Sequence, residues 1–122
     1  MDSRKFEGLV ARAVESLPEE FRERLENIDI IVVDRPTREQ QKALRGDEDE
    51  ILLGLYEGVP LIDRGNHYGF VMPDKITVFQ NSIESVCRND TEIVEEVQRV
   101  VIHEIAHHFG IDDDRLDELG WG

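Results

Sequence analysis

The segment from Asp90 to Gly110 constrains the fold more than any other part of the chain. Its apolar residues recur three and four positions apart, which places them on one wide face of a helix. These residues are Ile93, Val94, Val97, Val100, Val101, Ile105 and Phe109. Asp90 is the expected N-cap, and Gly110 is the residue expected to end the helix. The pattern predicts a long amphipathic helix that packs against the core near the C-terminus.

The end of this helix carries the sequence HEIAHHFGIDD at residues 103–113, which reads H-E-x-x-H followed by x-x-G-x-x-D. His103 and His107 are four residues apart, so they lie on one face of the helix, one turn from each other. Two imidazoles at this spacing can bind one Zn²⁺. Glu104, beside the first histidine, is placed to act as general base on a metal-activated water.

A catalytic zinc site also needs a third protein ligand and an open position for water. Asp113 is the expected third ligand, because a turn at Gly110 can swing the chain back toward the metal. Asp112 and Asp114 offer the same carboxylate, but the three-residue step after the glycine favours Asp113. The simpler interpretation of the motif is a charged helix with two histidines. Its position on a strongly periodic helix that ends in glycine favours the metal site.

A hydrolase of this kind needs a hydrogen-bond donor for the oxyanion of the tetrahedral intermediate. We expect this donor upstream of the motif, and the candidates are Tyr56, Arg64, His67 and Tyr68. Ordinary packing or solvation is the alternative interpretation of each. His108 points about 100° away from His107 on the helix, so we expect it to interact with the helix dipole rather than with a metal.

Two further helices are predicted near the N-terminus. Residues 3–17 place Phe6, Leu9, Val10, Ala13 and Leu17 on one stripe, with Ser3 as N-cap. A second short helix follows Pro18 over residues 19–27. Thr37 and Gln40 have the spacing of a capping box for a helix at residues 38–45. One or two helical turns are expected at residues 81–89 and a last turn at residues 113–119.

Three segments have strand character. Residues 28–34 are rich in β-branched residues and predict a buried strand. Residues 51–59 predict a second strand, with Gly54 as a bulge. Residues 75–80 alternate in a way that predicts a strand with one polar side, which is either an internal strand or an edge that pairs with a peptide. Helices around a small, mostly antiparallel sheet of about three strands predict a single α+β domain over residues 1–122.

The charge balance excludes one class of partner. Lys and Arg number 14 and Asp and Glu number 28, which gives a net charge of −14 and repulsion from a phosphate backbone. No apolar run approaches the roughly 20 residues of a membrane span or the pattern of a signal peptide. With Cys87 the single cysteine, the expectation is a monomeric cytoplasmic protein with no nucleic-acid or membrane partner.

The motif HEIAHHFGIDD resembles the zincin metallopeptidases, in the variant whose third ligand is aspartate. The chain length, the stretches ILLGLYEGVPLIDRG and PDKITVFQ, and the C-terminal position of the motif are similar to the minimal zincin family. The resemblance covers nearly the whole chain. It implies a short, strongly bent sheet against the active-site helix, with His103, His107 and Asp113 as zinc ligands and Glu104 as the base.

Two functions from different classes follow from these observations. The first is a zinc-dependent metallopeptidase that cleaves an extended peptide or protein substrate by attack of water on a peptide carbonyl. The alternative is a zincin-like module that binds a peptide or protein with weak or no catalytic activity. An oxyanion donor and a walled cleft would distinguish the peptidase from the binding module.

Overall fold

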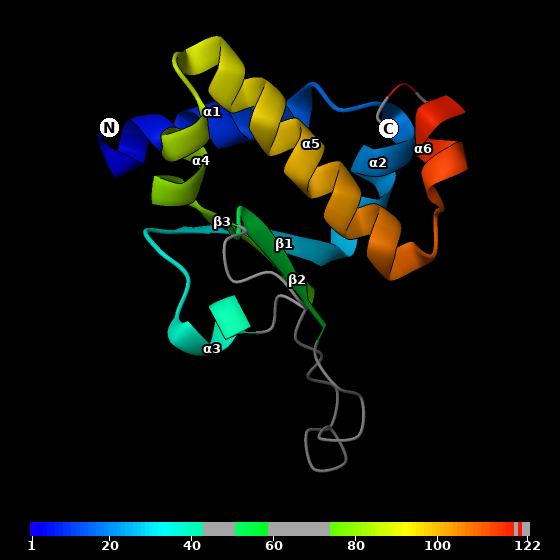
Figure 1. Ribbon diagram of the computed structural model, residues 1–122. Coiled ribbons are helices and arrows are strands. Elements are labelled where there is room, and N and C mark those ends of the chain that lie inside the picture. Colours follow the sequence, from blue (N-terminus) through cyan, green and yellow to red (C-terminus); the bar gives the residue numbers. More distant parts are fainter. Residues whose placement is uncertain (43–50, 59–73, 119, 121–122) are drawn as a thin grey trace, which may run out of the picture.

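The structure, a computed structural model, describes residues 1–42, 51–58, 74–118 and 120, with the side chain of Asp113 outside the description. Its elements are α1 (Ser3–Glu15), α2 (Glu19–Arg24), the 3₁₀ turn η1 (Leu25–Asn27), β1 (Ile28–Val33), α3 (Arg38–Lys42), β2 (Gly54–Glu57), β3 (Asp74–Phe79), α4 (Gln80–Val86), α5 (Asp90–Phe109) and α6 (Asp113–Glu118). Figure 1 shows α1, α2 and α5 on one side of the sheet and α3 on the other. The predicted α+β class is confirmed.

The sheet has three strands in the order β1-β3-β2. β2 pairs with β3 antiparallel, but β1 pairs with β3 parallel, from Ile28 opposite Asp74 to Val33 opposite Phe79. Among the described residues the expected number of strands is confirmed, whereas the sheet is mixed rather than mostly antiparallel. A parallel pair requires a long connection between its strands. The chain between β1 and β3, which includes α3 and β2, supplies that length.

β3 is the central strand, and this position decides which of its surfaces are accessible. Both of its edges are paired, and Ile76, Thr77, Val78 and Phe79 are all buried. The expectation of a polar side was therefore wrong, because Thr77 is only 2% exposed. The alternative of a free edge on this strand for a peptide is also excluded, since β1 and β2 occupy both positions.

β1 lies at the edge of the sheet rather than in its interior. Asp29 is exposed, Ile31 is 37% exposed, and the remaining residues of the strand are half-buried. The prediction of a buried strand was therefore wrong about its surroundings, although it was right about its existence. A β-branched run reports strand propensity, but it does not report whether a second neighbour is present.

Gly54 begins β2 and sits where the strand meets α5. The ladder of β2 with β3 is continuous from Gly54 opposite Val78, so the glycine is not a bulge as expected. A Cβ at this position would overlap Val100 Cγ1 and lie 3.2 Å from the carbonyl oxygen of Thr77. The absence of a side chain thus allows α5 to pack closely against β2.

The core lies between the sheet and the two longest helices. The predicted stripe of α1 is buried, and Phe21 and Leu25 from the second helical segment join it. Seven residues of α5 are buried: Ile93, Val97, Val100, Val101, Ile102, Ile105 and Ala106. Burial of apolar surface along both helices fixes the rotation of α5 about its axis.

The N-caps of α1 and α5 differ from the predictions by one residue each, while α1 ends at Glu15 rather than at residue 17 and α4 at Val86 rather than at residue 89. Asp2, not Ser3, caps α1 by accepting a hydrogen bond from Arg4 N at 2.7 Å. Asn89, not Asp90, caps α5 and accepts from Glu92 N at 2.9 Å.

The capping box of α3 is confirmed, because Thr37 and Gln40 exchange backbone-to-side-chain hydrogen bonds of 2.9 and 3.1 Å. This helix is described only to Lys42, since residues 43–50 lie outside the described residues. Within the described part of the chain, no helix combines the length and the apolar character needed to cross a membrane.

Candidate metal centre

The last turns of α5 present two histidines on one face. The ring centroids of His103 and His107 are 6.5 Å apart, and the rings are inclined by 55°. His103 is half-buried and His107 is exposed, while Ile105 on the other side of the helix is fully buried. Core packing therefore turns the two imidazoles outward together, as their spacing predicts.

Glu104 lies beside these histidines and against β2. Its Oε1 accepts a hydrogen bond of 2.9 Å from the backbone N–H of Tyr56, and its Oε2 lies 4.0 Å from His107 Nδ1. Burial raises the pKa of Glu104, and the Tyr56 hydrogen bond and the two histidines partly offset this rise. A carboxylate with a raised pKa is a stronger base than an ordinary glutamate, which suits proton transfer from water.

The register of β2 explains why the Tyr56 N–H is available to Glu104. Phe79 N donates to the carbonyl oxygen of Leu53 at 3.0 Å, and hydrogen-bonded positions alternate along an antiparallel pair. Tyr56, three residues after Leu53, therefore directs its N–H away from β3. No strand among the described residues pairs with this outer edge of β2.

The side chain of Tyr56 contacts the end of α5 and the start of β3. Its hydroxyl donates to Asp74 Oδ2 at 2.6 Å, and its ring stacks on His108 with the centroids 3.9 Å apart. Burial raises the pKa of the Tyr56 hydroxyl, and Asp74 raises it further. Tyr56 was a candidate oxyanion donor, and in this arrangement its hydroxyl proton is directed at Asp74.

Asp74 and His108 are the site neighbours that the sequence did not indicate. His108 Nε2 lies 3.9 Å from Asp74 Oδ2, so the two residues and Tyr56 form one cluster. One signal was available for His108: it follows Glu104 by four residues, so a strand that meets Glu104 also meets His108. The approach of Asp74 depends on the pairing of β2 with β3, which has no local signal.

A pocket of about 280 Å³ opens between residues 51–54 and α5. Its lining includes His103, Glu104 and His107, and it extends along the helix to Arg99 and Glu96. The two histidines of the motif and the carboxylate between them thus share one concave surface, as a binding site for a substrate requires.

The turn after α5 leads to the expected third ligand. Gly110 has a φ of 72°, and Ile111 N donates to the carbonyl oxygen of Ala106 at 2.8 Å. Asp112 caps α6 by accepting from Arg115 N at 2.8 Å. Asp113 follows as the first residue of α6, with its side chain outside the described structure.

The other three candidate oxyanion donors, Arg64, His67 and Tyr68, lie outside the described residues. In the described part of the chain, no three His, Cys, Asp or Glu side chains converge on one point. The described donors nevertheless fit zinc, because two imidazoles one turn apart on a helix are two of the three ligands that a catalytic site needs.

Comparisons with known proteins give the fold and the family. The fold is similar to that of a conserved hypothetical protein from Thermus thermophilus, with a TM-score of 0.55, 24% identity, and coverage of 89% of this chain and 94% of that chain. A search of curated proteins found no match. Residues 25–121 match the family described as zincin-like metallopeptidase. Because this match spans most of the chain and includes the whole histidine motif, the protein belongs to the zincin-like metallopeptidase family.

Proposed function

We propose that the protein is a zinc-dependent metallopeptidase, with His103, His107 and Asp113 as the metal ligands and Glu104 as the general base. One observation carries the proposal. The partly buried carboxylate of Glu104, with its raised pKa, shares a pocket with two histidines on the same helix face. Family membership supports the same reaction class.

The ligand set suits zinc by its chemistry. Imidazole nitrogens and a carboxylate oxygen are ligands that zinc accepts in a tetrahedral site, which leaves one position for water or substrate. When bound, zinc lowers the pKa of a coordinated water and polarises a peptide carbonyl. The exposure of His107 leaves the pocket open toward solvent, so substrate can reach this position.

Glu104 performs the proton transfers. The Tyr56 N–H holds Oε1 in place, so the other oxygen, Oε2, is directed toward the face that carries His107. This oxygen accepts a proton from the attacking water and delivers it to the leaving amine. A carboxylate fixed before the reaction loses less orientational freedom during it.

We infer that the substrate is a peptide or protein segment in an extended conformation. The outer edge of β2 is unpaired in the described residues and lies beside the pocket, through Gly54 and its neighbours. An extended peptide can add to such an edge through the remaining main-chain groups, since the Tyr56 N–H already donates to Glu104. This arrangement would bring a peptide carbonyl toward His103 and His107. We expect the protein to act as a monomer in the cytoplasm.

The test compares two isosteric substitutions in one pocket. Glu104→Gln removes the base, whereas Glu96→Gln makes the same chemical change at the far end of the pocket. Zinc content is measured by elemental analysis and affinity by calorimetry, and cleavage of a peptide library is followed by mass spectrometry. We expect one zinc per chain in all three proteins and a loss of cleavage of at least about a hundredfold in Glu104→Gln alone.

Two outcomes would contradict the proposal. Cleavage that survives in Glu104→Gln would exclude Glu104 as the base. Stoichiometric zinc binding without cleavage of any peptide by the wild-type protein would instead favour a zincin-like module that binds peptides or proteins.

A further inference from the structure

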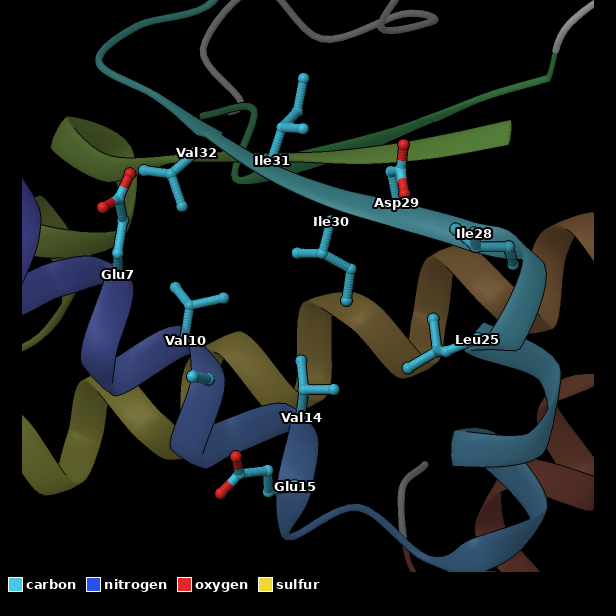
Figure 2. Close-up of a pocket in the computed structure, with 11 residues that line it drawn as sticks. Glu7, Val10, Val14, Glu15, Leu25, Ile28, Asp29, Ile30, Ile31 and Val32 are labelled. Carbon is cyan, nitrogen blue, oxygen red and sulfur yellow. The ribbon is translucent and has the colours of Figure 1, made fainter. Parts of the chain in front are cut away.

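A second and larger hollow lies at the opposite edge of the sheet from the candidate metal centre. It has a volume of about 670 Å³ and separates α1 from β1. Its apolar walls are formed by Val10, Val14, Leu25, Ile28, Ile30 and Val32. Figure 2 shows Ile30 and Val32 projecting from β1 toward Val10 and Val14 on α1. We propose that this groove binds an extended basic segment of a partner protein, which adds to the sheet as a strand beside β1.

The apolar side chains of β1 that face the groove are incompletely buried. In the parallel register Ile30 lies opposite Ile76 and Val32 opposite Val78, so each pair is on the same face of the sheet. Ile76 and Val78 are fully buried, whereas Ile30 and Val32, which pack against the same core, are only partly buried and line the groove. A strand placed beside β1 would put its own side chains over this surface and bury it, which is favourable in proportion to the apolar area covered.

The outer edge of β1 also favours the addition of a strand. β1 is at the end of the strand order, so its outer backbone groups have no partner strand among the described residues. Every residue of β1 except Asp29 is isoleucine or valine. Natural edge strands are usually protected by several charges, proline or a bulge, and a flat apolar edge is a template for pairing. Main-chain hydrogen bonds to such an edge are a known mode of peptide recognition.

Charge complementarity decides the kind of partner. Glu7 and Glu15 on α1 and Asp29 on β1 border the groove, and none of its lining residues is Lys or Arg. A second copy of this chain would bring its own net charge of −14 to the same surface. Like charges across an interface oppose association, whereas Lys and Arg side chains next to these carboxylates favour it. The occupant is therefore a basic segment, with alternate apolar side chains that enter the groove and with Lys or Arg side chains on the opposite face of the added strand, beside Asp29, or at its ends, beside Glu7 and Glu15.

The groove is independent of the proposed peptidase site. One of its walls is α1, which precedes residues 25–121, the region that matches the family. The two edge strands β1 and β2 lie on opposite sides of β3. A partner held at β1 therefore leaves the pocket beside His103 and Glu104 open, and binding at β1 requires neither zinc nor Glu104.

The test uses acetyl-Lys-Val-Lys-Val-Lys-Val-amide as the probe and the peptide with Glu in place of each Lys as its control. Binding is measured by calorimetry on the full chain, and hydrogen exchange reports on the amides of β1. We expect the basic peptide alone to bind and to slow exchange at β1. The triple variant Glu7→Gln, Glu15→Gln, Asp29→Asn should weaken binding by at least about fivefold.

A matched variant makes the same three charge changes elsewhere, at Glu95→Gln, Glu118→Gln and Asp117→Asn, which are all exposed. It should bind the peptide like wild type, and so should the zinc-free protein and Glu104→Gln. Three results would overturn the proposal: equal binding of the acidic peptide, no binding of the basic one, or equal weakening by both triple variants. Dimerisation of the wild-type chain with protection of β1 would also overturn it, because the occupant would then be a second copy.

Discussion

The backbone N–H of Tyr56 donates a hydrogen bond of 2.9 Å to Oε1 of Glu104 and thereby joins β2 to the helix that carries the histidine motif. The contact satisfies a strand-edge donor and a partly buried carboxylate at the same time. It also fixes the orientation of the side chain proposed as the base. The sheet therefore contributes to the candidate site through a backbone group, so the identity of the side chain at position 56 does not affect this hydrogen bond directly.

The stability of the zinc-free protein is expected to depend on pH through Glu104. Burial raises the pKa of Glu104, so the folded protein holds this proton more tightly than the unfolded chain does. The stabilisation that protonated Glu104 contributes to the folded state is complete below the ordinary pKa of glutamate. It is lost as the pH rises through the raised pKa of Glu104 in the folded state. Urea midpoints between about pH 4 and 8 should therefore decline less in Glu104→Gln than in wild type. An identical decline in both proteins would assign the effect to other groups.

Gly54→Ala should destabilise the fold by about 1–3 kcal/mol, because the new methyl group would overlap Val100. Gly8→Ala is the control: it lies in α1 with open space around its Cβ position, and it should stabilise the protein by about 0.5–1 kcal/mol. Both values come from denaturant unfolding. Adding Val100→Ala to Gly54→Ala should cost less than the sum of the two single changes. Strict additivity would show that the overlap is not the cause.

Three adjacent aspartates provide a test of the third ligand. Asp113→Ala should weaken zinc affinity far more than Asp112→Ala or Asp114→Ala, as measured by calorimetry or chelator competition. Asp112 already caps α6 through Arg115 N, so its loss should cost about 1 kcal/mol of stability instead. Asp114 is exposed and serves as the neutral control. Equal losses of affinity in all three variants would remove Asp113 from the ligand set.

Tyr56→Phe separates the hydroxyl from the backbone group of the same residue. The variant loses the 2.6 Å hydrogen bond to Asp74 but keeps the ring stack on His108 and the N–H bond to Glu104. We expect stability to fall by about 1–2 kcal/mol and kcat to stay within about threefold of wild type. A fall in kcat of about a hundredfold or more, with unchanged zinc affinity, would instead identify the hydroxyl as the oxyanion donor.

Local patterns predicted the element that matters most for the site. The periodicity of α5, the glycine that ends it and the four-residue spacing of His103 and His107 are all properties of one continuous segment. Such properties can be inferred without knowledge of the rest of the fold. The cap positions were each displaced by one residue, because Asp2 stands beside Ser3 and Asn89 beside Asp90, and all four are good capping residues.

The predictions that were wrong or missing concern contacts between segments that are far apart in the sequence. The parallel pairing of β1 with β3, the edge position of β1 and the central position of β3 depend on which strands meet. Alternation within one strand contains no information about its partners. The contacts of Tyr56 with Asp74 and His108 were not predicted for the same reason. The close approach at Gly54 required the position of α5 relative to β2.

α5 combines two roles that many enzymes divide between a rigid scaffold and separate loops. Ile102, Ile105 and Ala106, which are the sequence neighbours of His103, Glu104 and His107, are completely buried. The backbone amides of His103, Glu104 and His107 should therefore exchange their hydrogens as slowly as the core does, through global rather than local opening. Heat should inactivate and unfold the protein in a single cooperative transition.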